Sequence, residues 1–133
     1  MSVKKEYKKI TTNTLQEMKQ NGEKISMLTA YDYTLARIVD GAGIDIILVG
    51  DSLGITLYGM KNTQGVTLEI MEKHGLAVTK NVKESISVID MPYKSYENKR
   101  QAYTNAKKLL DSTKANFVKL EINSKKIPIV KYL

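Results

Sequence analysis

Cysteine and tryptophan are both missing from this sequence. Without cysteine the chain forms no disulfides and no thiolate metal sites, and this composition fits a reducing cytoplasm. No stretch approaches the ~20 consecutive apolar residues that a membrane-spanning helix needs. The first residues also lack the apolar core of a secretion signal. We therefore expect a soluble, cytoplasmic protein with no membrane partner.

Glycine-rich phosphate loops are absent as well. Gly50 and Gly54 do not form a G-x-G-x-x-G pattern, and no G-x-x-x-x-G-K loop occurs. Acidic residues are in the minority, with 14 Asp and Glu against 21 Lys and Arg, for a net charge of +7. Such a charge would suit a polyanion, but the lysines are scattered along the chain and no recognition motif accompanies them. We expect solvated surface charge and no nucleic-acid partner.

Strand and helix patterns alternate along the 133 residues, a length that suits one domain. A polar, lysine-rich arm over residues 1–11 precedes a short helix, for which Thr14 to Glu17 has the spacing of a capping box. Apolar and β-branched runs predict strands at residues 24–30, 44–49, 85–89 and 116–120, with helices near 34–42, 67–80 and 102–110 between them. This alternation predicts an α/β fold with parallel strands joined by right-handed crossovers.

Several local features follow from the same patterns. Residues 55–66 show no sustained period and are expected to form a loop beside an active site. Thr67 is expected to cap the third helix, and Gly75 inside it to weaken it by roughly 1 kcal/mol relative to alanine. His74, the only histidine, shares an apolar helical face, which favours a structural role. The second helix is expected to bury the residues that repeat at helical spacing, Leu35, Ile38, Val39 and Ala42.

Acidic residues stand at the ends of the predicted strands. In parallel α/β folds the C-terminal ends of all strands lie on one side, where the active site forms. Three clustered acids repel one another unless a cation lies among them, and hard oxygen ligands select Mg²⁺ or a similar divalent ion. The sequence therefore predicts a metal site at Asp51, Asp90 and Glu121, with Lys119 on the same face of its strand as Glu121.

Each of these residues also has a simpler interpretation. Asp32 precedes a helix and is expected to be its N-cap. Asp51 fits a turn or cap as well, and Asp90 fits a turn before a proline. Lys119 and Glu121 fit a surface ion pair. Spacing alone leaves these alternatives open.

Four segments in this order resemble the ketopantoate (3-methyl-2-oxobutanoate) hydroxymethyltransferase family, and together they extend over roughly residues 12–121. They are residues 24–33 (KISMLTAYDY), 47–54 (ILVGDSLG), 90–92 (DMP) and 118–121 (VKLE). The resemblance implies a TIM-type (β/α)₈ barrel. It also implies Mg²⁺-dependent transfer of a hydroxymethyl group from 5,10-methylenetetrahydrofolate to 3-methyl-2-oxobutanoate, on the route to pantothenate.

The resemblance further assigns residues to roles. Asp51 and Asp90 would bind Mg²⁺ directly, and Glu121 would complete the metal's shell. Ser52 and Lys119 would bind the oxoacid. The oxoacid would also chelate the Mg²⁺ ion, and would so be linked to Asp51 and Asp90. The family's general base is a glutamate in the second half of the barrel, which no residue here matches, so we assign no catalytic residue. Ile122-Asn123 replaces the family's Gly-Gly, which removes conformational freedom beside Glu121.

The length decides what the resemblance predicts for this chain. A complete barrel needs roughly 250 residues, so residues 1–133 should form one partial domain: about four strands of a half-barrel preceded by a short helix, with a divergent tail at 122–133. We expect Mg²⁺ and oxoacid binding with little or no turnover, in a homo-oligomer or paired with a second half-barrel. The alternatives are a non-catalytic half-barrel for interaction or assembly, and another metal-dependent lyase of small oxoacids.

Overall fold

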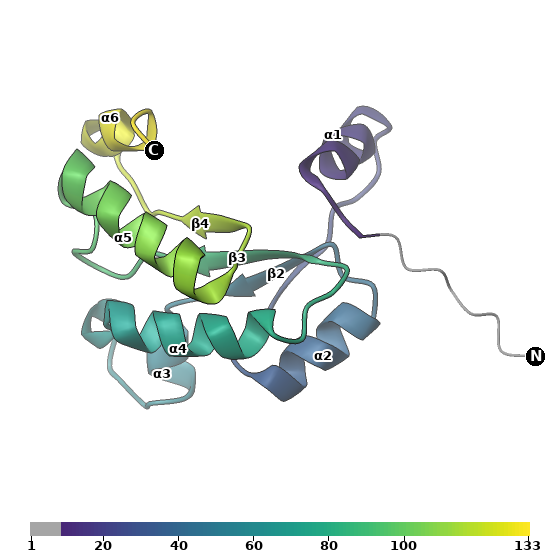
Figure 1. The fold of residues 1–133 in the computed structure, drawn as a ribbon, viewed down its shortest axis with the longest axis horizontal. Helices are drawn as coiled ribbons and strands as arrows, with labels where there is room; N and C mark the ends of the chain where they lie inside the picture. The colour runs from purple at the N-terminus through teal and green to yellow at the C-terminus, as the bar shows by residue number, and fades with distance from the viewer. Residues whose placement is uncertain (1–8) are drawn as a thin grey trace, which may run out of the picture.

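The computed structural model describes residues 9–133, which form a four-stranded parallel sheet with helices packed along it (Figure 1). The elements in chain order are α1 (Thr12–Gln20), β1 (Met27–Thr29), α2 (Tyr33–Gly41), β2 (Ile46–Val49), α3 (Leu53–Thr56), η1 (Thr63–Gly65), α4 (Leu68–Thr79), β3 (Ile86–Asp90), α5 (Lys99–Thr113), β4 (Phe117–Lys119), η2 (Ser124–Lys126) and α6 (Ile127–Val130). Residues 1–8 of the predicted arm lie outside the described residues. Just after them, the backbone N–H of Ile10 donates to the carbonyl of Glu84 at 2.7 Å.

The strands pair in the order β1-β2-β3-β4, each parallel to the next. Figure 1 shows α2, α4 and α5, the helices between successive strands, along the same side of this sheet. A doubly wound sheet reverses its strand order at a switch point, whereas sequential pairing with helices on one side is the arrangement found in (β/α)₈ barrels. The predicted parallel α/β fold is confirmed, and β1 and β4 form its two edges.

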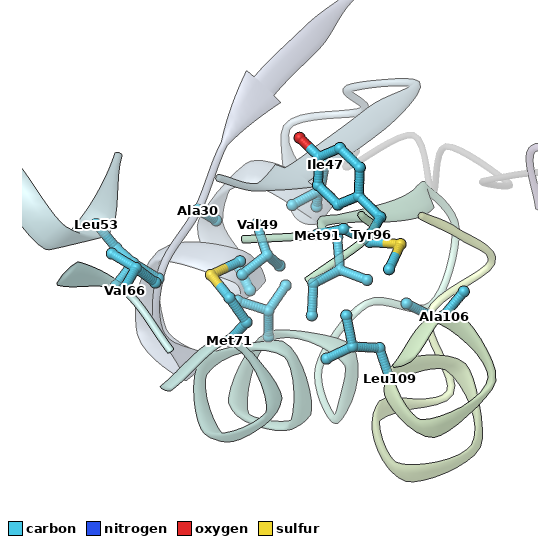
Figure 2. Packing of buried hydrophobic residues seen from close by; sticks show 14 of the residues in the cluster. Ala30, Ile47, Val49, Leu53, Val66, Met71, Met91, Tyr96, Ala106 and Leu109 are labelled. Carbon is cyan, nitrogen blue, oxygen red and sulfur yellow. The ribbon is translucent and has the colours of Figure 1, made fainter. Parts of the chain in front are cut away.

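The core lies between the sheet and the helix layer. Strand side chains alternate between the two faces, and those on the helix side, such as Val49 of β2 and Ile89 of β3, are fully buried. Met71 of α4 and Leu109 of α5 meet them from the helices (Figure 2). Burying each such side chain contributes roughly 1.5–3 kcal/mol, so this layer holds the strands in register.

Gly75 allows α4 to approach the sheet closely. A Cβ atom at this position would lie 2.5 Å from Cδ1 of Ile89 and 2.8 Å from Cγ2 of Thr113. The prediction that Gly75 simply weakens the helix was incomplete, because the site has no room for a methyl group. Thr67 caps α4 as predicted, since its side chain accepts the backbone N–H of Ile70.

Two local predictions were wrong. The capping box of α1 is formed by Thr11 and Thr14, which exchange backbone and side-chain hydrogen bonds, so the N-cap lies three residues before the predicted one. The segment expected to be a loop contains the end of the short helix α3 and the 3₁₀ turn η1. In both cases short-range hydrogen bonds form structure where the sequence has no hydrophobic period.

The apolar face predicted for α2 was also partly wrong. Val39 and the unpredicted Ala36 are buried, whereas Leu35 and Ala42 are exposed and Ile38 is 59% exposed. The reason is the position of α2 at the end of the helix layer, where it packs against α4 and β2. The side of α2 that faces away from α4 consequently has no neighbour in the described part of the chain.

Candidate active site

The C-terminal ends of the strands bring the predicted polar residues to one edge of the sheet. Asp90 is the last residue of β3 and lies directly beside its register partner Lys119, the last residue of β4. Asp51 and Ser52 follow β2 by two and three residues. Of the predicted site residues, these four converge most closely.

Asp90 links three strand ends. Its side chain is only 6% exposed, and its Oδ2 accepts the backbone N–H of Asp51 at 3.0 Å. Nζ of Lys119 lies 2.8 Å from Oδ1, where it forms an ion pair without the alignment of a hydrogen bond. Lys119 therefore balances the charge on Oδ1, which receives no other donor within the described residues.

Asp51 is half-buried and lies among like charges. Burial raises the pKa of its carboxyl, and repulsion from Asp90 and then Glu121 raises it further. Lys119 and a hydrogen bond from Thr63 oppose this shift but do not outweigh it. A carboxylate that its surroundings disfavour in the charged form is stabilised when a cation arrives.

Lys119 is the one cation inside this group of acids. Burial alone would lower its pKa, but the interaction with Asp90, followed by the charges of Glu121 and Asp51, raises the pKa above the usual lysine value. Its ammonium group is 2.8 Å from Asp90 and 3.6 Å from Glu121. Lys119 consequently stays protonated and available to an anion at neutral pH.

The hydroxyl of Ser52 lies beside the acids and is held by Tyr31. The two hydroxyl oxygens are 2.8 Å apart. Gly50 leaves the space for this arrangement, because a Cβ atom there would lie 2.9 Å from Oγ of Ser52 and 3.6 Å from Oδ2 of Asp90. Sequence reasoning missed the roles of Tyr31 and Gly50; the only available signal was their position next to predicted strand ends.

Glu121 is joined to the group less directly. Its side chain is 79% exposed, and it forms an ion pair with Lys119 at 3.6 Å. Its backbone is fixed by Tyr96, whose hydroxyl accepts the N–H of Glu121 at 3.2 Å and donates to its carbonyl at 3.0 Å. Tyr96 is buried, and Figure 2 shows its hydroxyl directed away from the hydrophobic cluster. This clamp fixes the backbone where the sequence has Ile122-Asn123.

Asp32 and His74 lie near this edge in supporting positions. Asp32 caps α2 as predicted, because its side chain accepts the N–H of Leu35 at 2.8 Å. His74 bonds through Nδ1 to the carbonyl of Tyr31 at 2.6 Å and through Nε2 to the hydroxyl of Tyr58 at 3.0 Å. The histidine thus joins the loop after β1 to the segment after α3.

The residues present fit a Mg²⁺ ion with two protein carboxylates. Among residues 9–133 no three His, Asp or Glu side chains are placed to hold a metal by themselves. Mg²⁺, however, commonly takes one or two carboxylates and fills its other positions with water and substrate oxygens. Lys119 offsets only part of the charge of Asp51, Asp90 and Glu121, and the raised pKa of Asp51 indicates that a further cation would be stabilised here. Glu121 fits only as an outer partner.

Comparison with known proteins gives a consistent result along the chain. The family model for ketopantoate hydroxymethyltransferase matches residues 9–133. This chain is 48% identical, over 90% of its length, to the protein named 3-methyl-2-oxobutanoate hydroxymethyltransferase from Flavobacterium johnsoniae. It is 51% identical, over 86% of its length, to the protein of that name from Phocaeicola vulgatus. The protein of that name from Christiangramia forsetii is 49% identical over 91% of the chain. These matches cover 44%, 42% and 45% of the three relatives, so the chain spans less than half of their length.

A solved structure supports the fold independently. The crystal structure of 2,3-dimethylmalate lyase, a member of the PEP mutase/isocitrate lyase superfamily, superposes with a TM-score of 0.58 over 79% of this chain and 38% of its own. Its sequence identity of 18% supports a shared fold and nothing finer. In the described residues no helix is long and apolar enough to cross a membrane. The family match and the high identity establish that the chain belongs to the ketopantoate hydroxymethyltransferase family.

Proposed function

We propose that this chain provides the metal- and oxoacid-binding half of a 3-methyl-2-oxobutanoate hydroxymethyltransferase. The observation that carries the proposal is the position of Asp90, a buried carboxylate at the strand ends that accepts the N–H of Asp51 and pairs with Lys119. The names of the relatives support the substrate, 3-methyl-2-oxobutanoate. The one-carbon donor would be 5,10-methylenetetrahydrofolate.

Asp51 and Asp90 would hold Mg²⁺, with Glu121 reaching it through water. The bound ion would polarise the keto group of a chelating oxoacid and make the neighbouring C–H more acidic. Ser52 would donate a hydrogen bond from its hydroxyl to the oxoacid. Lys119 supplies a fixed positive charge close to the oxygen on which negative charge develops, and a fixed charge of this kind stabilises the transition state.

The proposed half-site has no assigned base for the C3 proton. Asp51 and Asp90 are the proposed metal ligands, and Lys119 is protonated because its pKa is raised. The family's base belongs to the second half of the barrel, for which this chain has no counterpart. We therefore expect the chain alone to bind the oxoacid and to catalyse little or no transfer.

Calorimetry and proton exchange together test the proposal. Titration with 3-methyl-2-oxobutanoate should release heat in Mg²⁺ and none in EDTA, because the oxoacid needs the ion. Exchange of its C3 proton into D₂O should stay at the rate of a blank with Mg²⁺ alone. No Mg²⁺-dependent binding would contradict the proposed function, whereas fast exchange by this chain would contradict the missing base.

We also propose a second half-barrel as the partner of this chain. Both sheet edges carry exposed apolar side chains, with Met27 and Leu28 of β1 44% and 50% exposed and Phe117 of β4 41% exposed. An open, apolar strand edge pairs readily with another chain. Gel filtration at several concentrations should show an assembly larger than 15.0 kDa, and a monomer at every concentration would contradict this pairing.

A further inference from the structure

A path of hydrogen bonds that passes through the covalent frame of Tyr31 connects Ser52 to His74 of α4. Oγ of Ser52 is 2.8 Å from the hydroxyl of Tyr31, whose own carbonyl lies 2.6 Å from Nδ1 of His74. Nε2 of His74 lies 3.0 Å from the hydroxyl of Tyr58, and the two rings meet edge to face at 5.8 Å. The path therefore joins the segments after β1, β2 and α3 to one helix of the layer.

The side chain of Ser52 does not cap the helix that follows it. Ser52 precedes α3, where a serine side chain commonly accepts a backbone N–H of the first turn. Here it makes no capping bond and its hydroxyl is turned to Tyr31 instead. The backbone of Ser52 is in the αR region, which does not suit a capping bond, so its hydroxyl is available to Tyr31.

We propose that Tyr31 and His74 are positioning residues that aim the hydroxyl of Ser52 at the oxoacid. This inference rests on the proposed function, because it takes the oxoacid as the acceptor of a hydrogen bond from Ser52. If Tyr31 donates to Oγ of Ser52, the serine proton is left to point at an anion. The bond from Tyr31 also polarises the serine O–H, since hydrogen bonds in a chain strengthen one another.

His74 fixes the loop that carries Tyr31. A carbonyl oxygen only accepts, so Nδ1 of His74 must carry a proton, and Nε2 is then left to accept the hydroxyl of Tyr58. For a neutral ring this arrangement is the tautomer protonated on Nδ1, with Nε2 as the acceptor. The bond to the carbonyl of Tyr31 is short, and it holds the backbone from which the tyrosine ring extends.

The tautomer is the first test, and it needs no ligand. His74 is the only histidine of the chain, so its ring nitrogens are assigned without ambiguity in a two-bond ¹H–¹⁵N spectrum. We expect a protonated Nδ1 and a bare Nε2 at pH 8. A protonated Nε2 with a bare Nδ1 would overturn the proposed path, whatever the chain binds.

The second test separates positioning from general support. Calorimetry should show Tyr31→Phe weakening the Mg²⁺-dependent binding of 3-methyl-2-oxobutanoate about threefold to tenfold, the value of one hydrogen bond. The affinity for Mg²⁺ alone should stay within twofold, because Asp51 and Asp90 are not in the path. Tyr103→Phe is the control: Tyr103 is exposed and lies on α5 beside Tyr132, and its change should leave both affinities unaltered.

Variants of His74 complete the design. His74→Ala should weaken oxoacid binding by about threefold through the freed loop, and His74→Asn should restore it, since the asparagine amide can donate to the carbonyl of Tyr31. Equal loss of Mg²⁺ and oxoacid affinity in Tyr31→Phe, or no loss of either, would overturn the positioning role. Failure of the unaltered chain to bind the oxoacid would instead refute the proposed function, and the tautomer would still decide whether the path exists.

Discussion

The two ends of the sheet treat their carboxylates in opposite ways. At the N-terminal end Asp40 accepts three backbone N–H groups and the hydroxyl of Ser85, and Asp45 accepts the N–H and hydroxyl of Ser26 at 2.8 and 2.7 Å. Burial would raise the pKa of Asp40, but the donors from Ser85, Lys83 and Glu84 outweigh it and lower the pKa. These carboxylates are satisfied by the chain itself.

At the C-terminal end the balance is reversed. The pKa of Asp51 is raised by burial and by neighbouring acids, and within the described residues Oδ1 of Asp90 is balanced only by the ion pair with Lys119. Buried polar groups that have hydrogen-bond partners stabilise a fold, whereas groups with perturbed pKa values are concentrated at functional sites. An acidic residue beside a strand therefore indicates a functional site only when the donors to its carboxylate are known.

The largest expected effect is at the N-terminal end. Asp40→Ala leaves three backbone N–H groups without their acceptor, and we expect the free energy of unfolding to fall by about 3 kcal/mol, since each buried unsatisfied donor is costly. Urea unfolding followed by circular dichroism measures this change. The control is Asp111→Ala, which removes only an exposed ion pair with Lys107 and should have little effect. Equal unfolding curves for the two variants would remove the distinction between the ends.

Two glycines sharpen the same comparison. Gly75→Ala forces a methyl group against Ile89 and Thr113 in the core, and should cost about 2 kcal/mol of unfolding free energy with no selective effect on the oxoacid. Gly50→Ala meets only Oγ of Ser52 at under 3.0 Å, and this side chain can rotate away. Its stability should change by less than about 1 kcal/mol, while calorimetry shows weaker oxoacid binding. Similar stability losses in both variants would contradict this account.

Tyr96→Phe tests whether Glu121 depends on its backbone clamp. The change removes two hydrogen bonds to Glu121 while keeping the buried ring, and should lower the unfolding free energy by about 1 kcal/mol. Mg²⁺ affinity should decline only slightly, because Glu121 is an outer partner of the ion. A loss of Mg²⁺ affinity as large as that of Asp90→Asn would instead make Glu121 a direct ligand.

The smallest expected effect has the opposite sign at the two ends and depends on pH. The raised pKa of Asp51 means that its charged form opposes folding above that pKa, and this penalty disappears as the pH falls below the unfolded value near 3.8. Asp51→Asn should therefore stabilise the metal-free chain slightly at pH 7 and not near pH 3.

The lowered pKa of Asp40 contributes stability above pH 3.8 that is lost as the pH falls through the folded pKa, so the cost of Asp40→Ala should shrink in acid. Urea unfolding from pH 3 to 7 measures both trends, and parallel pH profiles would contradict them.

Sequence patterns predicted the fold well because hydrophobic periodicity reports burial directly. The run Ile46–Val49 and the helix that begins after Thr67 were both located correctly. Patterns failed where burial depended on a neighbour, as for Ile38, which has the right spacing but is 59% exposed.

The candidate site was predictable in its acids but not in its supports. Asp51 and Asp90 stand at strand ends, a position that sequence can locate. Tyr31 and Gly50 act through distances of 2.8 and 2.9 Å to the same Ser52 hydroxyl, and such contacts between segments leave no periodic signal. The same limit applies to Asp45 and Asp51, which flank one strand in the sequence but differ in the donors and neighbouring acids that the fold brings to them.

The central claim is that the acids at the C-terminal end, and not those at the N-terminal end, bind a divalent cation. Titration with Mg²⁺ by calorimetry, on the unaltered chain and on three Asp→Asn variants, tests it directly. We predict that Asp45→Asn binds Mg²⁺ like the unaltered chain, while Asp51→Asn and Asp90→Asn bind at least about tenfold more weakly, as expected when a metal-ligand oxygen is lost. Equal Mg²⁺ affinity in all four proteins would contradict the claim.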